Sequence, residues 1–166
     1  QVTVFDQAVQ FEKSLHDDLD RIAENEEAHK ALNTIRLITM VQTGSKFNYN
    51  RIRELNPLMD TVRTAHDKML GEKRAEVLET VRQCMEATHT AANGDSKASH
   101  LIEKSDRYFS QCKEKIAELK SLALLDAMFL PMCQYKDDTV GNIESVLAPP
   151  APKPQVQPTQ QGKETA

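Results

Sequence analysis

The side chains that perform most enzyme chemistry are present in this chain, but their spacing matches no catalytic or metal-binding pattern. The sequence has no Gly-rich turn followed by Lys-Ser or Lys-Thr, no paired-Cys zinc pattern and no His-Glu-x-x-His. No nucleophile has an identifiable base partner. The five histidines are scattered along the chain: His16, His29, His66, His89 and His100. We therefore expect no catalysis, no bound metal and no cofactor.

Two groupings of titratable residues could still invite a metal interpretation. Four acids gather on one face of the first predicted helix: Asp17, Asp18, Asp20 and Glu24. Neighbouring acids on a helix do not converge on one ion, so we interpret this face as solvated. His89 and His100 could face each other near the end of a helical hairpin, where we expect both to lie in water.

The cysteines predict free thiols. Cys84, Cys112 and Cys133 show no spacing typical of a disulfide framework. Buried cysteines usually act as small hydrophobic residues. Free buried thiols fit a reducing compartment, so we expect a cytoplasmic protein.

One basic segment with interleaved aromatic residues could contact nucleic acid. Its cations could meet phosphates while an aromatic ring stacks on a base. The alternative is that the aromatic rings pack as a cap on a helical bundle. The candidate contacts are Lys46, Tyr49, Arg51 and Arg53.

Composition predicts one helical domain with enough length to bury a core. The 166 residues are 39% hydrophobic and 28% charged, and the net charge of -4 gives no broad attraction to nucleic acid or anionic membranes. No apolar run approaches the roughly 20 residues that span a bilayer. The chain begins with Gln1 and lacks a basic-then-apolar leader, so we interpret it as an excerpt of a longer protein or a processed product.

The predicted organising element is an antiparallel α-hairpin over residues 56–147, with its turn at 93–96. An Asn-Pro pair at 56–57 is suited to begin the first arm, and the Asn-Gly pair of the turn tolerates the left-handed conformation that ends helices. We expect the second arm to continue through the apolar run 121–130. Pro131 then kinks that helix or starts a new one.

Two helices precede the hairpin and a proline-rich segment follows it. Apolar residues at spacings of three and four predict a helix over 3–24 and another, capped by Asn25, to about Gln42. Residues 148–166 contain five of the seven prolines and no apolar pattern. We interpret them as a disordered or extended linker after an all-α bundle domain over 1–147.

Apolar stripes on the two arms mirror each other about the turn, as in a coiled coil. Lys73 is a misfit in this pairing, within a charged run. The apolar face of the first arm changes phase near Gly71, either as a tolerated irregularity or as a bend. The mirrored pairs are Leu101 with Thr88, Tyr108 with Val81, and Cys112 with Val77.

The apolar run after residue 121 predicts a surface for another protein. It is apolar nearly all round, which is more than one neighbouring helix can cover. Either the run is part of a homodimer or partner interface, or a closed four- or five-helix bundle buries it. The candidate surface residues are Leu122, Leu125, Met128, Phe129 and Leu130.

Four stretches resemble one protein family. They look like the C-terminal helical region of the large P-loop ATPase of bacteriophage-exclusion (BREX) defence systems, in which a proline-rich spacer also follows. The resemblance covers most of residues 46–160 and includes no ATPase motif. The stretches are RIRELNPLMDTV from Arg51, ETVRQCME from Glu79, KSLALLD from Lys120 and QYKDDT from Gln134.

The resemblance implies a non-catalytic interaction or scaffolding module of a bacterial cytoplasmic ATPase. Its hairpin would hold subunits together or dock a partner of the defence complex. Two rival functions are a stand-alone structural coiled-coil protein and a helical nucleic-acid-binding domain that uses residues 46–53.

Overall fold

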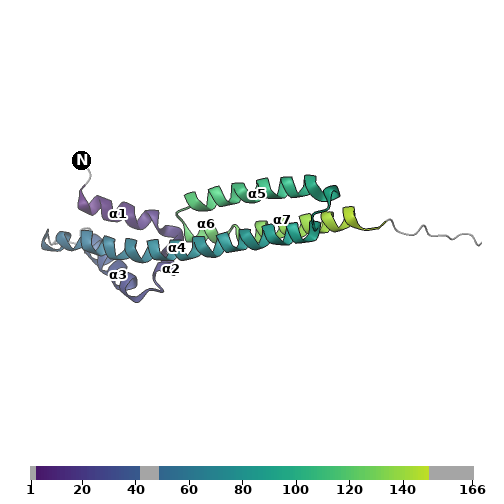
Figure 1. Ribbon diagram of the computed structural model, residues 1–166. Coiled ribbons are helices and arrows are strands. Elements are labelled where there is room, and N and C mark those ends of the chain that lie inside the picture. The colour runs from purple at the N-terminus through teal and green to yellow at the C-terminus, as the bar shows by residue number, and fades with distance from the viewer. Residues whose placement is uncertain (1–2, 42–48, 150–166) are drawn as a thin grey trace, which may run out of the picture.

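The chain forms an elongated helical bundle in the computed structural model, which describes residues 3–41 and 49–149 (Figure 1). These residues contain no β-strand, so the predicted all-α class is confirmed. Most of the predicted linker, residues 150–166, lies outside the described part. The elements are α1 (Val4–Ser14), η1 (His16–Asp18), α2 (Leu19–Ile22), α3 (Glu26–Val41), α4 (Tyr49–Ala92), η2 (Ser96–Ala98), α5 (Ser99–Glu118), α6 (Leu122–Asp126) and α7 (Phe129–Leu147).

Helix α4 is the axis on which the other helices pack (Figure 1). It runs unbroken through residues 56–57, so the predicted helix start at this point is wrong and Pro57 lies inside the helix. An interior proline costs roughly 3 kcal/mol. Leu55, Met59 and Val62 on the same stretch are at most 1% exposed. Burying three such side chains contributes about 1.5–3 kcal/mol each, which exceeds the local cost.

The first half of α4 packs against α1 and α3 around an aliphatic core. Helix α1 begins with a capping box, in which Thr3 Oγ1 accepts a hydrogen bond from the Asp6 amide at 3.1 Å. The predicted cap of α3 is confirmed, because Asn25 Oδ1 accepts from the Ala28 amide at 3.0 Å. Local polar residues therefore cap the start of both helices, and the apolar face of each helix packs into the core.

A break at Leu15 divides the helix predicted over 3–24 into α1, η1 and α2. Leu15 has φ -99° and ψ 7°, and a 3-10 turn follows it. A continuous helix would have kept Asp18 on the acidic outer face beside the exposed Asp17. The break instead turns Asp18 inward, where it is only 3% exposed. The cause is tertiary, because the hydrogen-bond donors for Asp18 lie on α6.

The second half of α4 packs against α5 and α7, which gives a second three-helix bundle (Figure 1). Helix α5 runs back along α4 and ends at Glu118, and the chain is extended at Ser121. The predicted continuous arm through 121–130 is therefore wrong, because the chain reverses and α7 runs in the direction of α4. Stacked rings join α5 to α7, with the centroids of Tyr108 and Tyr135 3.8 Å apart.

Three features stabilise this reversal. The Arg74 guanidinium donates to the Leu119 carbonyl at 2.6 Å, which places a cation at the C-terminal end of α5. Ser121 Oγ accepts from the Leu124 amide at 3.3 Å and begins α6. Pro131 falls within the first turn of α7, where backbone N–H groups have no helical acceptor, so it helps to begin a helix.

The predicted hairpin turn is correct, but the helix pairing beyond it is shifted by one helical turn. Asn93 and Gly94 have positive φ angles of 48° and 71°. Ser105 Oγ donates to Thr88 Oγ1 at 3.4 Å, where the sequence pattern paired Thr88 with Leu101. The 3-10 turn η2 lengthens the connection and so displaces the register. The same offset along the two helices predicts Val81 level with Cys112 instead of Tyr108, and Val77 level with Ile116 instead of Cys112.

The phase change near Gly71 marks the point where α4 passes from one core to the other. Val62 belongs to the first core and Leu70 to the second, while Met69 contacts both. The helix continues through Gly71 without interruption. The apolar face rotates because α1 and α3 pack on the helix before this point and α5 and α7 after it.

Candidate functional site

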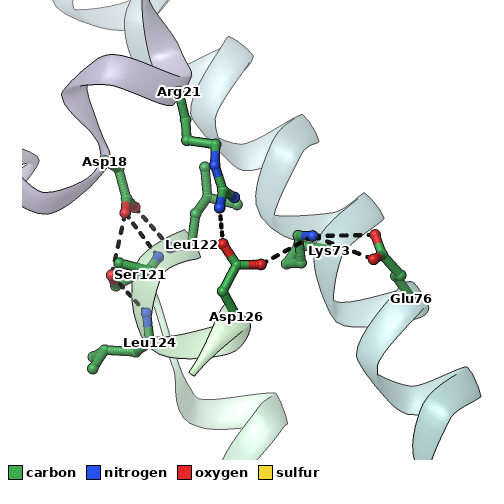
Figure 2. Close-up of polar contacts among 9 residues, drawn as sticks. Asp18, Arg21, Lys73, Glu76, Ser121, Leu122, Leu124 and Asp126 are labelled. Carbon is green, nitrogen blue, oxygen red and sulfur yellow. Dashed lines mark hydrogen bonds and ion pairs between the residues drawn. The ribbon is translucent and has the colours of Figure 1, made fainter. Parts of the chain in front are cut away.

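A buried polar joint connects the two bundles, and Asp18 lies at its centre (Figure 2). Its Oδ2 accepts from the Leu122 amide at 2.8 Å and lies 2.7 Å from His66 Nε2. Its Oδ1 accepts from the Ala123 amide at 3.1 Å and from the Ser121 hydroxyl at 3.2 Å. Asp18 therefore caps α6 from 103 residues before Ser121 in the chain.

The joint favours the ionised form of Asp18. Burial on its own would raise the pKa of this carboxyl. Hydrogen bonds from the Leu122 amide, the His66 ring and the Ala123 amide outweigh burial and hold the pKa below its usual value of 3.8. The N-terminal end of α6 adds a favourable dipole. The carboxylate is thus a stable, charged acceptor near neutral pH.

The contacts of the joint occupy the acceptor sites of Asp18. Each oxygen of Asp18 is bonded to two groups, so all four of its acceptor sites are used and none remains for a substrate or a metal ion. Ser121 donates to one oxygen of Asp18 and His66 lies against the other, so the joint has no Ser-His pair. The sequence interpretation of Asp18 as part of a solvated acidic face is therefore wrong, whereas Asp17 is exposed as expected.

A charged network extends the joint to α2 and the middle of α4 (Figure 2). Asp126 at the end of α6 pairs with Arg21 and with Lys73, the latter at 3.1 Å. The Lys73 ammonium also lies 5.5 Å from the centroid of the Phe129 ring and bonds to Glu76. The apparent misfit of Lys73 in the hairpin thus has a structural explanation, because this cation holds α6 and α7 against α4.

An apolar groove of about 360 Å³ lies where α5, α6 and the start of α7 meet. Apolar side chains from all three segments line it, with Gln111 and Lys115 among its polar residues. Leu124 on this groove is 51% exposed, and Leu130, which precedes the groove residue Pro131 in the chain, is 66% exposed. We call this region, the groove with Leu124 and Leu130, the apolar surface.

The predicted association residues divide between the core and this surface. Leu122 and Leu125 are at most 2% exposed and belong to the second core, so their assignment to a partner surface is wrong. Phe129 is partly buried beneath Lys73. Met128 lines the groove and Leu130 is exposed, so these two remain available. The turn before α6 buries one side of the run, which its uniform apolar composition did not reveal.

The predicted nucleic-acid contacts do not form one cationic surface among the described residues. Lys46 lies outside the described residues, and Tyr49 is the first residue of α4. Arg51 is paired with Glu54 at 3.1 Å, and Arg53 is exposed on the same helix. The described residues thus bring no group of unpaired cations together at this end of α4.

The histidine pairing at the hairpin end is also corrected. His89 Nε2 lies 2.8 Å from Asp106 Oδ1, so its partner is an acid and not His100. This pairing follows the shifted helix register. No group of three or more His, Cys, Asp or Glu within the described residues could hold a metal ion.

The joint is the feature that sequence reasoning missed. Only one local signal pointed to it, because Ser121 directly precedes an apolar run, as a helix cap does. Asp18 gave no signal at all, since His66 lies 48 residues away and its other partners lie more than 100 residues away.

Comparisons place the chain beside no known protein, because no family model, curated protein or solved structure matches it. Within residues 3–41 and 49–149, no helix is both long enough and apolar enough to cross a bilayer. The fold and its surfaces therefore carry the functional argument.

Proposed function

We propose that this chain is a non-catalytic helical scaffolding module that holds copies of its parent protein together. The observation that carries this proposal is the apolar surface. Leu124 on the groove and Leu130, which precedes the groove residue Pro131 in the chain, are both exposed to water, although the neighbouring helices bury most of their other large apolar side chains. Exposed apolar groups that gather beside a concave surface are typical of protein interfaces.

The architecture supports the same function. Helix α4 belongs to both cores, and the polar joint fixes the two bundles to each other. A continuous helix of 44 residues spans roughly 66 Å at 1.5 Å per residue. Such a body keeps its two ends in a fixed arrangement and so presents the apolar surface in a fixed position. A symmetric pair of copies could bury this surface by inserting Leu130 of each copy into the groove of the other.

Light scattering across a concentration series tests the proposal. We expect the wild-type mass to rise from monomer to dimer as concentration increases. Leu124→Glu with Leu130→Glu should keep the protein monomeric, because each carboxylate would lose water at the interface. Leu37→Glu on α3 is the matched control, since Leu37 is 57% exposed outside the groove, and it should still dimerise. A wild-type monomer at every concentration would contradict the proposal.

The finer proposal concerns the parent protein. The resemblance of four helical stretches to the large BREX ATPase supports a parent of that kind in the bacterial cytoplasm. We expect a phosphate-binding loop in the sequence encoded upstream of Gln1, and its absence would contradict this assignment. In the parent protein, the Leu124→Glu and Leu130→Glu pair should abolish protection in a phage plaque assay, whereas Leu37→Glu should retain it.

A further inference from the structure

Two of the three cysteines meet across the interface between α4 and α7. The Cys84 thiol on α4 is 3% exposed and donates to the Met132 carbonyl of α7 over 3.9 Å. Met132 directly precedes Cys133, so this contact also brings Cys84 close to the half-buried Cys133, whose thiol interacts electrostatically with that of Cys84. Cys112 contacts Tyr108 instead. The packing of α4 against α7 thus brings together two cysteines that are far apart in the chain.

We propose that Cys84 and Cys133 are an oxidation-sensitive thiol pair, which peroxide converts to a disulfide that joins α4 to α7. The two residues differ in access, which assigns their roles. Cys133 is open to solvent on one side, so peroxide reaches it first. Cys84 is buried, so it acts second, on a sulfur atom that is already beside it.

The chemistry balances with hydrogen peroxide as the oxidant. The Cys133 thiolate attacks one peroxide oxygen, the O–O bond breaks and a sulfenic acid forms; the other oxygen leaves as hydroxide, which becomes water with the proton that the Cys133 thiol released on ionisation. The Cys84 sulfur then bonds to the Cys133 sulfur and displaces hydroxide, which takes up the Cys84 proton. Two thiols and one peroxide give one disulfide and two waters, and the peroxide accepts two electrons.

The environment of the two thiols supports the order in which we propose that they react. Burial raises the pKa of the Cys84 thiol to about 11, and the neighbouring Cys133 adds to that shift. Cys84 therefore stays a thiol and does not meet peroxide as an anion. The Lys136 ammonium, held 2.8 Å from Asp137, lies near the pair and partly offsets the effect of burial on the pKa of Cys84.

Peptide mapping of the full chain after mild hydrogen peroxide treatment tests the proposal. We expect the intact mass to fall by two hydrogen atoms and a dithiothreitol-sensitive linkage to join the peptides that carry Cys84 and Cys133. The disulfide closes a long loop of the unfolded chain, so the melting temperature should rise by roughly 5–10 °C. Cys84→Ser and Cys133→Ser should each abolish the linkage.

Cys112→Ser is the matched control and should leave the linkage unchanged. The wild-type map is independent of whether any variant folds. Oxidation of Cys133 to sulfinic acid without a linkage, or a linkage that involves Cys112, would overturn the proposal.

Discussion

Asp18 shows how one carboxylate can define the relation between two bundles. It comes from the break after α1, yet its partners include His66 of α4 and the first amides of α6. An isolated buried carboxylate would be strongly destabilising, but one with four hydrogen bonds is a specific anchor. Its specificity arises because these donors meet only in the assembled fold.

Replacement of Asp18 by asparagine should lower the free energy of unfolding by on the order of 3 kcal/mol near neutral pH. An amide nitrogen would then face hydrogen-bond donors in the joint, and the charge that stabilises them would be lost. Asp17→Asn is the matched control, because Asp17 is adjacent and exposed, and we expect almost no change. Urea unfolding measures both. Equal stabilities for the two variants would show that the joint contributes nothing.

The same residue predicts how stability depends on pH. The pKa of Asp18 is lower in the folded protein than its usual value of 3.8, so the folded state binds fewer protons. Its contribution is complete above that usual value and disappears as pH falls through the folded pKa. The stability difference between wild type and Asp18→Asn should therefore shrink in acid below pH 3.8. A difference that stays constant through this range would contradict the assignment.

At the scale of elements, local chemistry predicted the helices and tertiary contacts decided their ends. Apolar periodicity, the Asn25 cap and the Asn-Gly turn are local signals, and each appears in the structure as predicted. The break at Leu15, the continuity through Pro57 and the reversal before Ser121 depend on distant partners. A single sequence pattern cannot reveal those partners. The groove has the same origin, because it exists only where the reversal brings three helices together.

Gly71 offers a test of the element at the centre of the fold. It is an exposed interior residue of α4, and a Cβ atom there would have no heavy atom within 4 Å. Gly71→Ala should therefore raise the free energy of unfolding by about 1 kcal/mol, through helix propensity and reduced freedom of the unfolded chain. Urea unfolding provides the measurement, and a loss of stability would indicate that α4 requires flexibility at this point.

Gly94→Ala is the matched control for that substitution. A Cβ atom at Gly94 would also meet no heavy atom within 4 Å, but the φ of 71° disfavours every residue that carries a Cβ atom. We expect this variant to lose roughly 1 kcal/mol of stability, since the left-handed conformation costs about that much. Stability changes of opposite sign in the two variants would separate the conformational effect from any effect of added volume.

At the scale of the whole molecule, two cores share one helix. Met69 contacts both cores, and the polar joint closes the same region from the other side. Together these links should make the bundles unfold as one unit. This expectation differs from that for two domains on a flexible linker, in which each core opens independently.

Hydrogen exchange in increasing urea, followed by mass spectrometry of peptides, measures this coupling. Peptides of α1 and α3 should lose protection at the same urea concentration as peptides of α5 and α7 in the wild type. In Asp18→Ala the two groups should separate, with the first bundle opening earlier. Coincident transitions in that variant would mean that α4 alone couples the bundles.

The distance in sequence between Asp18 and α6 also has a consequence during synthesis. Ser121 leaves the ribosome 103 residues after Asp18, which at roughly 5–20 residues per second is a delay of about 5–20 seconds. Helices α1 and α3 can close on the first half of α4 during that time. During this interval Asp18 remains a solvated anion, and its charge keeps that end of the nascent bundle hydrated until α6 has been synthesised and its amides bind the carboxylate.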